Sequence, residues 1–238
     1  MVDHAFTDTR LARLYDTLNP WAACDDFYLD LVRGAGSVLD VGCGTGALLA
    51  RAREEGHGGR LVGLDPAAGM LAVARERADV EWVSGTLRSA RVAGGFDLVV
   101  MTGHAFQVWV DDDEIRASLA AVRELLGAGG RFAFETRNPL ARAWERWGSA
   151  RVGGVRVTHD VVGGFDGRTV TFTTTYDVAG WAGVEVSRST LRFLSEGELD
   201  RFLREAGFTV AARYGDWTGS PFAADSPEII TVCEALPR

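Results

Sequence analysis

Short apolar segments alternate with segments of helical periodicity along most of the chain. Continuous runs such as Leu98-Val99-Val100-Met101 are typical of strands buried on both faces of a sheet. The segments between them are amphipathic, and 111–126 opens with three acids at its amino end, where a helix dipole favours negative charge. This alternation predicts an α/β domain with a doubly wound, mostly parallel sheet. The predicted helices are 11–18, 27–32, 47–55, 66–78 and 111–126, and the first five strands are 37–41, 60–65, 80–84, 96–102 and 131–136.

One region, between about residues 152 and 194, breaks the alternation. Three segments with period-two or β-branched patterns, 152–162, 168–178 and 184–194, follow one another with glycine-rich loops between them. They predict an antiparallel three-stranded meander inserted after the fifth strand. Such an insertion covers a pocket or pairs with a second copy of the chain in a homodimer, and the alternative is a simple extension of the sheet. A helix capped by Ser195 and two last strands, 208–214 and 228–233, bring the main sheet to seven strands.

The first predicted strand runs into a glycine-rich turn, Val38-Leu39-Asp40-Val41-Gly42-Cys43-Gly44-Thr45-Gly46. Glycine accepts positive φ and lets backbone approach a ligand closely, so a strand, this turn and a helix form a nucleotide-binding arrangement. Dinucleotide sites typically read G-x-G-x-x-G, whereas Gly42, Gly44 and Gly46 give G-x-G-x-G. No lysine follows the turn, which argues against a P-loop.

Composition limits the remaining possibilities. The chain has 238 residues and 25 basic against 33 acidic side chains, a net charge of −8. This length suits a single domain over 1–238 with an N-terminal helical cap over 1–35. The negative charge, without a basic run, disfavours nucleic acid and anionic membrane as partners. Three scattered cysteines predict neither a disulfide framework nor a metal site, and the lack of an apolar leader or span leads us to expect a cytoplasmic protein.

The acid followed by glycines at alternate positions resembles the first motif of the class I S-adenosylmethionine-dependent methyltransferases. The resemblance implies the fold of that family, with the last two strands as an edge hairpin, and S-adenosylmethionine as cofactor with S-adenosylhomocysteine as product. Asp40 is then placed to meet the methionine ammonium, directly or through water, and Asp65 to accept from both ribose hydroxyls, although Asp65 also suits a helix cap. The remaining residues predicted to contact the cofactor are Tyr15, Gly42, Cys43, Gly44, Thr45, Gly46, Pro66, Met70, Gly85, Thr86, Leu87, Thr102, Gly103 and Gln107.

Three of these residues carry alternatives. Tyr15 either closes over the methionine end of the cofactor or packs only against protein. Met70 lies against the adenine or in the core. The family often has an Asp at the position of Thr86, which contacts the adenine amino group, so here adenine recognition falls to the Thr86 hydroxyl and the Leu87 backbone.

His104 follows the fourth strand, beside which the transferring methyl lies in this family. An unperturbed histidine titrates near neutral pH, so His104 is the predicted general base, with a pocket-lining or structural role as the alternative. Arg137, Asn138, Tyr214 and Trp217 are predicted, with His104, to bind the acceptor, and Arg137 alternatively pairs with protein acids.

The sequence thus predicts an enzyme that moves a methyl group to an oxygen, nitrogen or carbon of a small-molecule acceptor by in-line displacement. The alternatives are a non-catalytic S-adenosylmethionine-binding regulatory protein and an NAD-dependent oxidoreductase.

Overall fold

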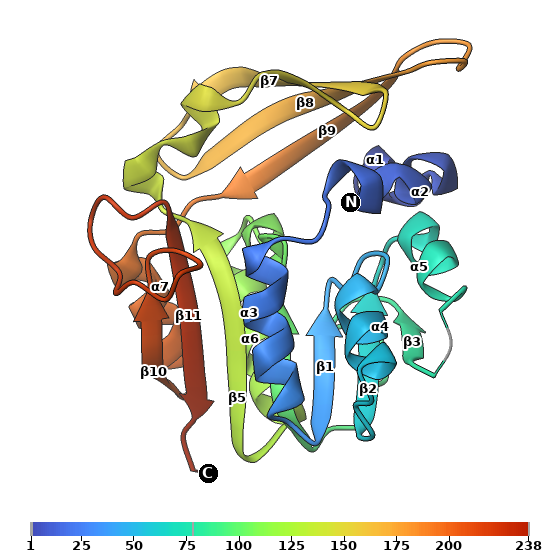
Figure 1. The fold of residues 1–238 in the computed structure, drawn as a ribbon. Helices are drawn as coiled ribbons and strands as arrows, with labels where there is room; N and C mark the ends of the chain where they lie inside the picture. The colour runs from blue at the N-terminus through green and yellow to red at the C-terminus, as the bar shows by residue number, and fades with distance from the viewer. Residues whose placement is uncertain (1, 78, 238) are drawn as a thin grey trace.

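The computed structural model describes residues 2–77 and 79–237, which form two sheets, one above the carboxyl edge of the other (Figure 1). The main sheet has seven strands in the order β10-β11-β5-β4-β1-β2-β3. All of its pairings are parallel except those of β11, which runs antiparallel to both β5 and β10. The bounds are β1 Ser37–Val41, β2 Arg60–Asp65, β3 Glu81–Ser84, β4 Phe96–Met101, β5 Leu126–Arg137, β10 Phe208–Tyr214 and β11 Glu228–Ala235.

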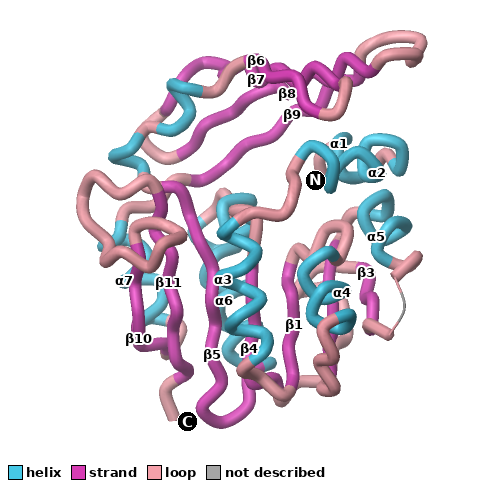
Figure 2. Tube along the Cα trace, viewed as in Figure 1, coloured by secondary structure: helices cyan, strands magenta, loops and turns pink. Residues whose placement is uncertain are grey.

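Helices cover both faces of this sheet, as the tube view shows (Figure 2). On one face, α3 (Ala23–Arg33) and α4 (Ala47–Glu54) pack on Val38, Leu98 and Ala133. On the other face, α6 (Asp112–Leu125) and α7 (Glu196–Glu205) pack on the alternate residues of the same strands, including Leu39 and Val99. These strand residues are fully buried because both faces of the sheet are covered, which explains their continuous apolar runs. The doubly wound architecture is therefore confirmed.

The inserted sheet has four strands rather than the predicted three. Its order is β6-β7-β8-β9, with β6 Ser149–Val152, β7 Val155–Phe165, β8 Thr169–Val178 and β9 Glu185–Arg192, all antiparallel. The additional strand, β6, pairs with β7 across a turn in which Gly153 and Gly154 both have positive φ. β6 has only four residues, mostly exposed, so it carries no hydrophobic period that sequence analysis detects.

The two faces of the inserted sheet differ in character. One face carries His159, Phe172 and Thr174, whose side chains are buried or half-buried. The opposite face carries threonines and charges, among them Thr173, Asp160 and Arg188. One half-buried face and one polar face are compatible with a cover over a pocket, and that role stays a prediction. The role of the sheet as a dimer interface also stays a prediction.

Two N-terminal helices, α1 (His4–Thr7) and α2 (Thr9–Leu18), lie between the inserted sheet and α5 (Ala68–Ala74) (Figure 1). The side chain of Asp8 caps α2 by accepting from the amides of Arg10 and Leu11. The Ala5 amide donates to Ser187 of β9 at 3.0 Å, and Arg13 pairs with Glu76 just beyond α5. The N-terminal segment therefore bridges two parts of the molecule that are distant in sequence.

Several element ends differ from the prediction. α5 begins after Pro66 and ends at Ala74, four residues before the predicted end, which lies outside the described residues. β5 begins at Leu126, five residues earlier than expected, because Leu126 already pairs with Phe96 of β4, and a register shift follows before Arg131 pairs with Leu98. Among the described residues no helix is long and apolar enough to span a membrane.

Candidate active site

The glycine turn leaves β1 beside the point where the strand order reverses between β1 and β4. Ligands of open α/β sheets bind in the crevice at such a point. Gly42, Gly44 and Gly46 have φ of 77°, 55° and 73°, all in the left-handed region that favours glycine. A Cβ on Gly46 would also overlap the indole ring of Trp82, which lies beneath the turn. Because these positions have no side chains, a ligand can approach the backbone of the turn closely.

Asp65, at the end of β2, organises this turn. One carboxylate oxygen accepts from the Gly44 amide at 2.9 Å and the other from the Ala67 amide at 2.7 Å. The side chain thus holds the glycine turn and the residues before α5, so the helix-capping alternative describes part of its role. Each carboxylate oxygen has a second lone pair for a ligand hydroxyl. Both of these contacts are therefore compatible with the ribose contacts predicted for Asp65.

Asp40, the residue before the end of β1, has a buried carboxylate oxygen without a partner among the described residues. It is 1% exposed, and Oδ1 has no hydrogen bond among the described residues. Burial, followed by the charges of Asp65 and Glu135, raises the pKa of Asp40 to about 8. A buried acid that lacks a donor is costly unless a ligand supplies one. The ammonium of a bound methionine group is such a donor, so the residues present fit S-adenosylmethionine.

Cofactor binding is expected to be coupled to release of a proton by Asp40. With a pKa of about 8, Asp40 is mostly protonated at pH 7 in the free enzyme. The ammonium of bound S-adenosylmethionine would favour the ionised form of Asp40. Affinity for S-adenosylmethionine should therefore rise between about pH 6 and 8, and calorimetry at pH 7 in buffers of different ionisation enthalpy should detect proton release. In Asp40→Asn both effects should vanish. An affinity independent of pH in the wild-type enzyme would contradict this assignment.

The N-terminal helices approach the same turn from above. The Thr45 hydroxyl donates to Asp16 of α2 at 2.5 Å, and Arg77 pairs with the other oxygen of Asp16. Tyr15 lies over the end of β4, with its hydroxyl 3.7 Å from the place a Cβ on Gly103 would occupy. Met70 is buried among Ala12 and Ala67, with Tyr15 beside that cluster. Neighbouring residues of α2 thus reach Thr45 and Gly103, whereas Met70 packs in a protein core.

At the predicted adenine end, Thr86 and Leu87 follow β3. The Thr86 amide donates to the Ser89 hydroxyl at 2.9 Å, and the Thr86 hydroxyl lies 3.2 Å from the same oxygen. Gly85 has φ of 139° and donates its amide to Asp65 O. Leu87 is half-buried against the main core, and Pro66 is exposed. Cys43 is buried among Leu71, Ala74 and Trp82, so its thiol supports the turn.

The ends of β4, β5 and β11 meet around His104. Its Nε2 lies 3.0 Å from Glu228 Oε2, and its amide donates to Glu135 Oε1 at 2.6 Å. Glu135 is 1% exposed, and its second oxygen accepts from the Tyr28 hydroxyl of α3. Burial raises the pKa of Glu135 and raises that of Tyr28 well above its usual value. The bond from Glu135 holds His104 at φ 61°, a left-handed conformation that is uncommon outside glycine.

Sequence analysis missed Glu228 and Tyr28 as site residues, and it gave Glu135 no role of its own within the strand-five end. Glu228 reaches His104 because β11 runs antiparallel to β5, which places Glu228 opposite Arg137 and Ile230 opposite Glu135. No local pattern in the sequence specifies that register. The one feature of the sequence that could have indicated these two glutamates is that each is an acidic residue near the end of a predicted strand.

The residues predicted to bind the acceptor have different environments. Arg137, half-buried, ends β5 and faces Trp147 beneath the inserted sheet. Asn138 is 2% exposed, donates to Ala224 O and Ser226 O and accepts from the Leu140 amide, so its polar groups hold loops. Both Tyr214 and Trp217 pack against Phe27 of α3. Of the four, only Arg137 therefore faces the space beneath the inserted sheet.

Gln107 is likewise engaged by protein groups. It is fully buried, donates to Arg192 O at 2.8 Å and accepts from Arg137 at 3.1 Å. Its side-chain amide joins the end of β5 to the end of β9, and the cofactor contact predicted for it stays a prediction. Thr102, directly after β4, is half-buried.

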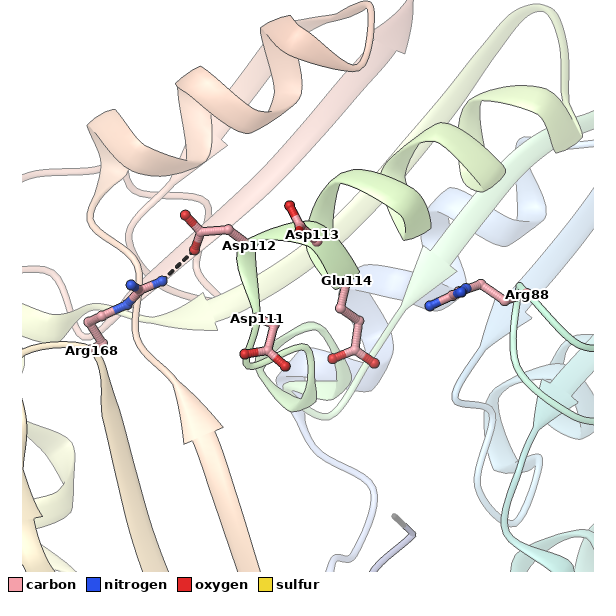
Figure 3. A pocket seen from close by; sticks show the side chains of 6 residues that line it. All are labelled: Arg88, Asp111, Asp112, Asp113, Glu114 and Arg168. Atoms are coloured by element: carbon pink, nitrogen blue, oxygen red, sulfur yellow. Dashed lines mark hydrogen bonds and ion pairs between the residues drawn. The ribbon is translucent and has the colours of Figure 1, made fainter.

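A separate hollow lies at the amino end of α6 (Figure 3). Asp112 in its wall pairs with Arg168 at 2.5 Å and with buried Arg192 at 3.1 Å. None of the residues predicted to bind cofactor or acceptor lines it. These pairs tie the inserted sheet to α6, and the hollow lies outside the site around His104. Its lining residues are Arg88, Asp111, Asp112, Asp113, Glu114 and Arg168.

Comparison with known proteins identifies the family of the chain. Residues 38–130 match a family described as a methyltransferase domain. The chain is 32% identical over 212 residues to a cypemycin N-terminal methyltransferase from a Streptomyces species, covering 83% of this chain and 82% of that protein. A 2-phytyl-1,4-naphtoquinone methyltransferase from Thermosynechococcus vestitus is 35% identical over 153 residues, covering 58% of this chain and 66% of that protein.

Solved structures show the same fold. An S-adenosylmethionine-dependent methyltransferase from Clostridium acetobutylicum has a TM-score of 0.81 at 15% identity, covering 96% of this chain and 98% of that one. An amino pentose methyltransferase from Micromonospora echinaspora, solved with bound S-adenosylmethionine, has a TM-score of 0.69 at 26% identity, covering 93% and 94%. The cypemycin, Thermosynechococcus and Micromonospora proteins are each named a methyltransferase, which favours that interpretation over an oxidoreductase or a non-catalytic binder. By sequence and by fold, the chain belongs to the class I S-adenosylmethionine-dependent methyltransferases.

Proposed function

We propose that this enzyme methylates an amine nitrogen of a small-molecule acceptor. The observation that carries the proposal is the cluster of His104, Glu135 and Glu228 at the carboxyl end of β4 and β5. An amine arrives mostly as an ammonium ion, which carboxylates attract, and it must lose a proton before its lone pair reacts. The His104–Glu228 pair meets both needs, because Glu228 attracts the cation and His104 takes the proton.

Each residue of the cluster has a separate role in this mechanism. Bound S-adenosylmethionine supplies a methyl group on a sulfonium sulfur, which the amine nitrogen would attack in line with the carbon–sulfur bond. Glu228 orients the imidazole of His104 through the 3.0 Å contact. Glu135 fixes the backbone at His104, and Tyr28 fixes Glu135. The inserted sheet and α2 cover the crevice and limit the access of water.

The names of two of the similar proteins support nitrogen as the acceptor atom, whereas the Thermosynechococcus protein is named for a naphthoquinone. The cypemycin enzyme is an N-terminal methyltransferase, and the Micromonospora protein is an amino pentose methyltransferase. The oxygen and carbon acceptors left open by the sequence do not require a cluster that attracts a cation.

Product mapping tests the acceptor atom. The enzyme is incubated with methyl-labelled S-adenosylmethionine and matched acceptors that carry an amine, a hydroxyl or an activated carbon, and the methylated atom is identified by NMR. We expect methylation at nitrogen, with S-adenosylhomocysteine formed in equal amount. Products methylated only at oxygen or carbon would overturn the proposal.

A further inference from the structure

The guanidinium of Arg137 is surrounded by an aromatic ring and a neutral amide. Arg137 is the last residue of β5, and its guanidinium lies 5.5 Å from the centroid of the Trp147 ring. Its Nη1 donates to Gln107 Oε1 at 3.1 Å, and the same oxygen accepts from the Arg137 amide. Gln107 is itself fixed by its bond to Arg192 O. The guanidinium is therefore held in place by a neutral amide and an aromatic ring.

No acid pairs with this guanidinium within the part of the chain that the structure describes. Glu228 stands opposite Arg137 on β11, but its carboxylate contacts His104. Glu135 is engaged by Tyr28 and by the His104 amide. Gln107 Oε1 is the one acceptor of the guanidinium among the described residues, so most of its N–H donors are left for a ligand. Burial lowers the pKa of Arg137 although both acids act in the opposite direction.

The free N–H donors of the Arg137 guanidinium suit an anionic group of a ligand. Trp147 packs edge-on to Phe172 at 4.8 Å, and His159 lies 5.8 Å from Phe172, so the inserted sheet offers aromatic rings here. Burial and the charge of Arg137 lower the pKa of His159, which keeps this imidazole neutral. Glu135 and Glu228 are close enough to oppose a doubly charged phosphate. A carboxylate carries a single charge and matches the planar fork of a guanidinium.

We propose that Arg137 binds a carboxylate of the acceptor, so that the substrate is an amino acid or another amine that bears a carboxylate. This inference rests on the proposed amine methylation and adds the second group that the site recognises. The amine end lies at the His104–Glu228 pair and the carboxylate end beneath Trp147. The two ends are adjacent because Arg137 and Glu228 are paired across β5 and β11.

Matched ligand pairs test this inference. The probes are amino acids and dipeptides, each with its decarboxylated amine, together with O-phosphoethanolamine, titrated by calorimetry into the enzyme saturated with S-adenosylhomocysteine. We expect carboxylate-bearing members to bind the wild-type enzyme, and Arg137→Gln to weaken their binding about 10- to 100-fold. Arg137→Lys should recover part of the loss, because lysine keeps the charge but not the fork. Arg168→Gln, which removes a cation outside the site, is the matched control and should bind like the wild type.

The inference is overturned if the wild-type enzyme binds the carboxylate-bearing ligands and their decarboxylated amines equally well, or binds neither. It is also overturned if the enzyme prefers O-phosphoethanolamine, or if Arg137→Gln still prefers the carboxylate-bearing ligands. Unchanged affinity of all three variants for S-adenosylhomocysteine shows that they fold. Failure of the proposed function gives a different result from failure of this inference. In that case the enzyme still binds carboxylate-bearing ligands preferentially, but the product is methylated at oxygen or carbon. Methylation at nitrogen without carboxylate dependence instead removes Arg137 from the acceptor site and leaves the proposed function intact.

Discussion

Replacement of His104 by asparagine is expected to lower kcat about 100-fold or more while cofactor affinity changes little, because a positioned general base contributes roughly 10²–10⁴-fold. Asparagine is the informative substitution, because it tolerates the left-handed backbone at φ 61° better than alanine does. The measurement is single-turnover methyl transfer with an amine acceptor, with its pH profile. The variant should lose one ionisation from that profile. Unchanged turnover would remove the proton-transfer role.

Glu228→Gln is the companion variant. The glutamine side chain is nearly isosteric and still reaches His104, but it lacks the charge that attracts an ammonium. We expect kcat to fall by about 10-fold and KM for the amine to rise, since the carboxylate both orients the imidazole and attracts the cation. A loss of cofactor affinity in either variant would point to a structural role instead.

Replacement of Asp65 by alanine is expected to weaken S-adenosylmethionine binding about 100-fold or more. The predicted ribose contacts are two charge-assisted hydrogen bonds of about 1.5–3 kcal/mol each. The substitution also leaves the amides of Gly44 and Ala67 without their acceptor, so the glycine turn loses its support. Calorimetric titration with S-adenosylmethionine measures the change in affinity.

Asp65→Asn separates these two contributions. It keeps one oxygen acceptor for a backbone amide but can no longer accept from both ribose hydroxyls. Thermal unfolding of Asp65→Asn should therefore lie closer to the wild type than that of Asp65→Ala, while its cofactor affinity stays low. Affinity equal to that of the wild-type enzyme would show that Asp65 acts only as a support for the turn.

The centre of the main sheet could be predicted because β1, β2 and β4 are short, mostly apolar segments that are almost entirely buried. Asp40 and the glycine turn could also be predicted, because the residues that define them are consecutive in the sequence. β6 was missed because four mostly exposed residues carry no hydrophobic period.

The candidate site was harder to predict because polar residues at a strand end look alike in sequence, whatever they contact. Asn138 and Gln107 were assigned to ligands, but their hydrogen bonds go to protein groups. Glu228 reaches His104 only through the pairing of β11 with β5, which joins segments about 90 residues apart in the chain. Such pairings are set by the fold as a whole.

The position of α1 and α2 has a consequence for redesign of this enzyme. α2 contacts the cofactor turn through Asp16 and Thr45, while α1 bonds to β9 through Ala5 and Ser187. Mutations that reshape β9 for a new acceptor would shift α1 and so alter affinity for the methyl donor. Substitutions on β7 and β8 avoid this route, and libraries for new specificity are therefore best confined to those two strands.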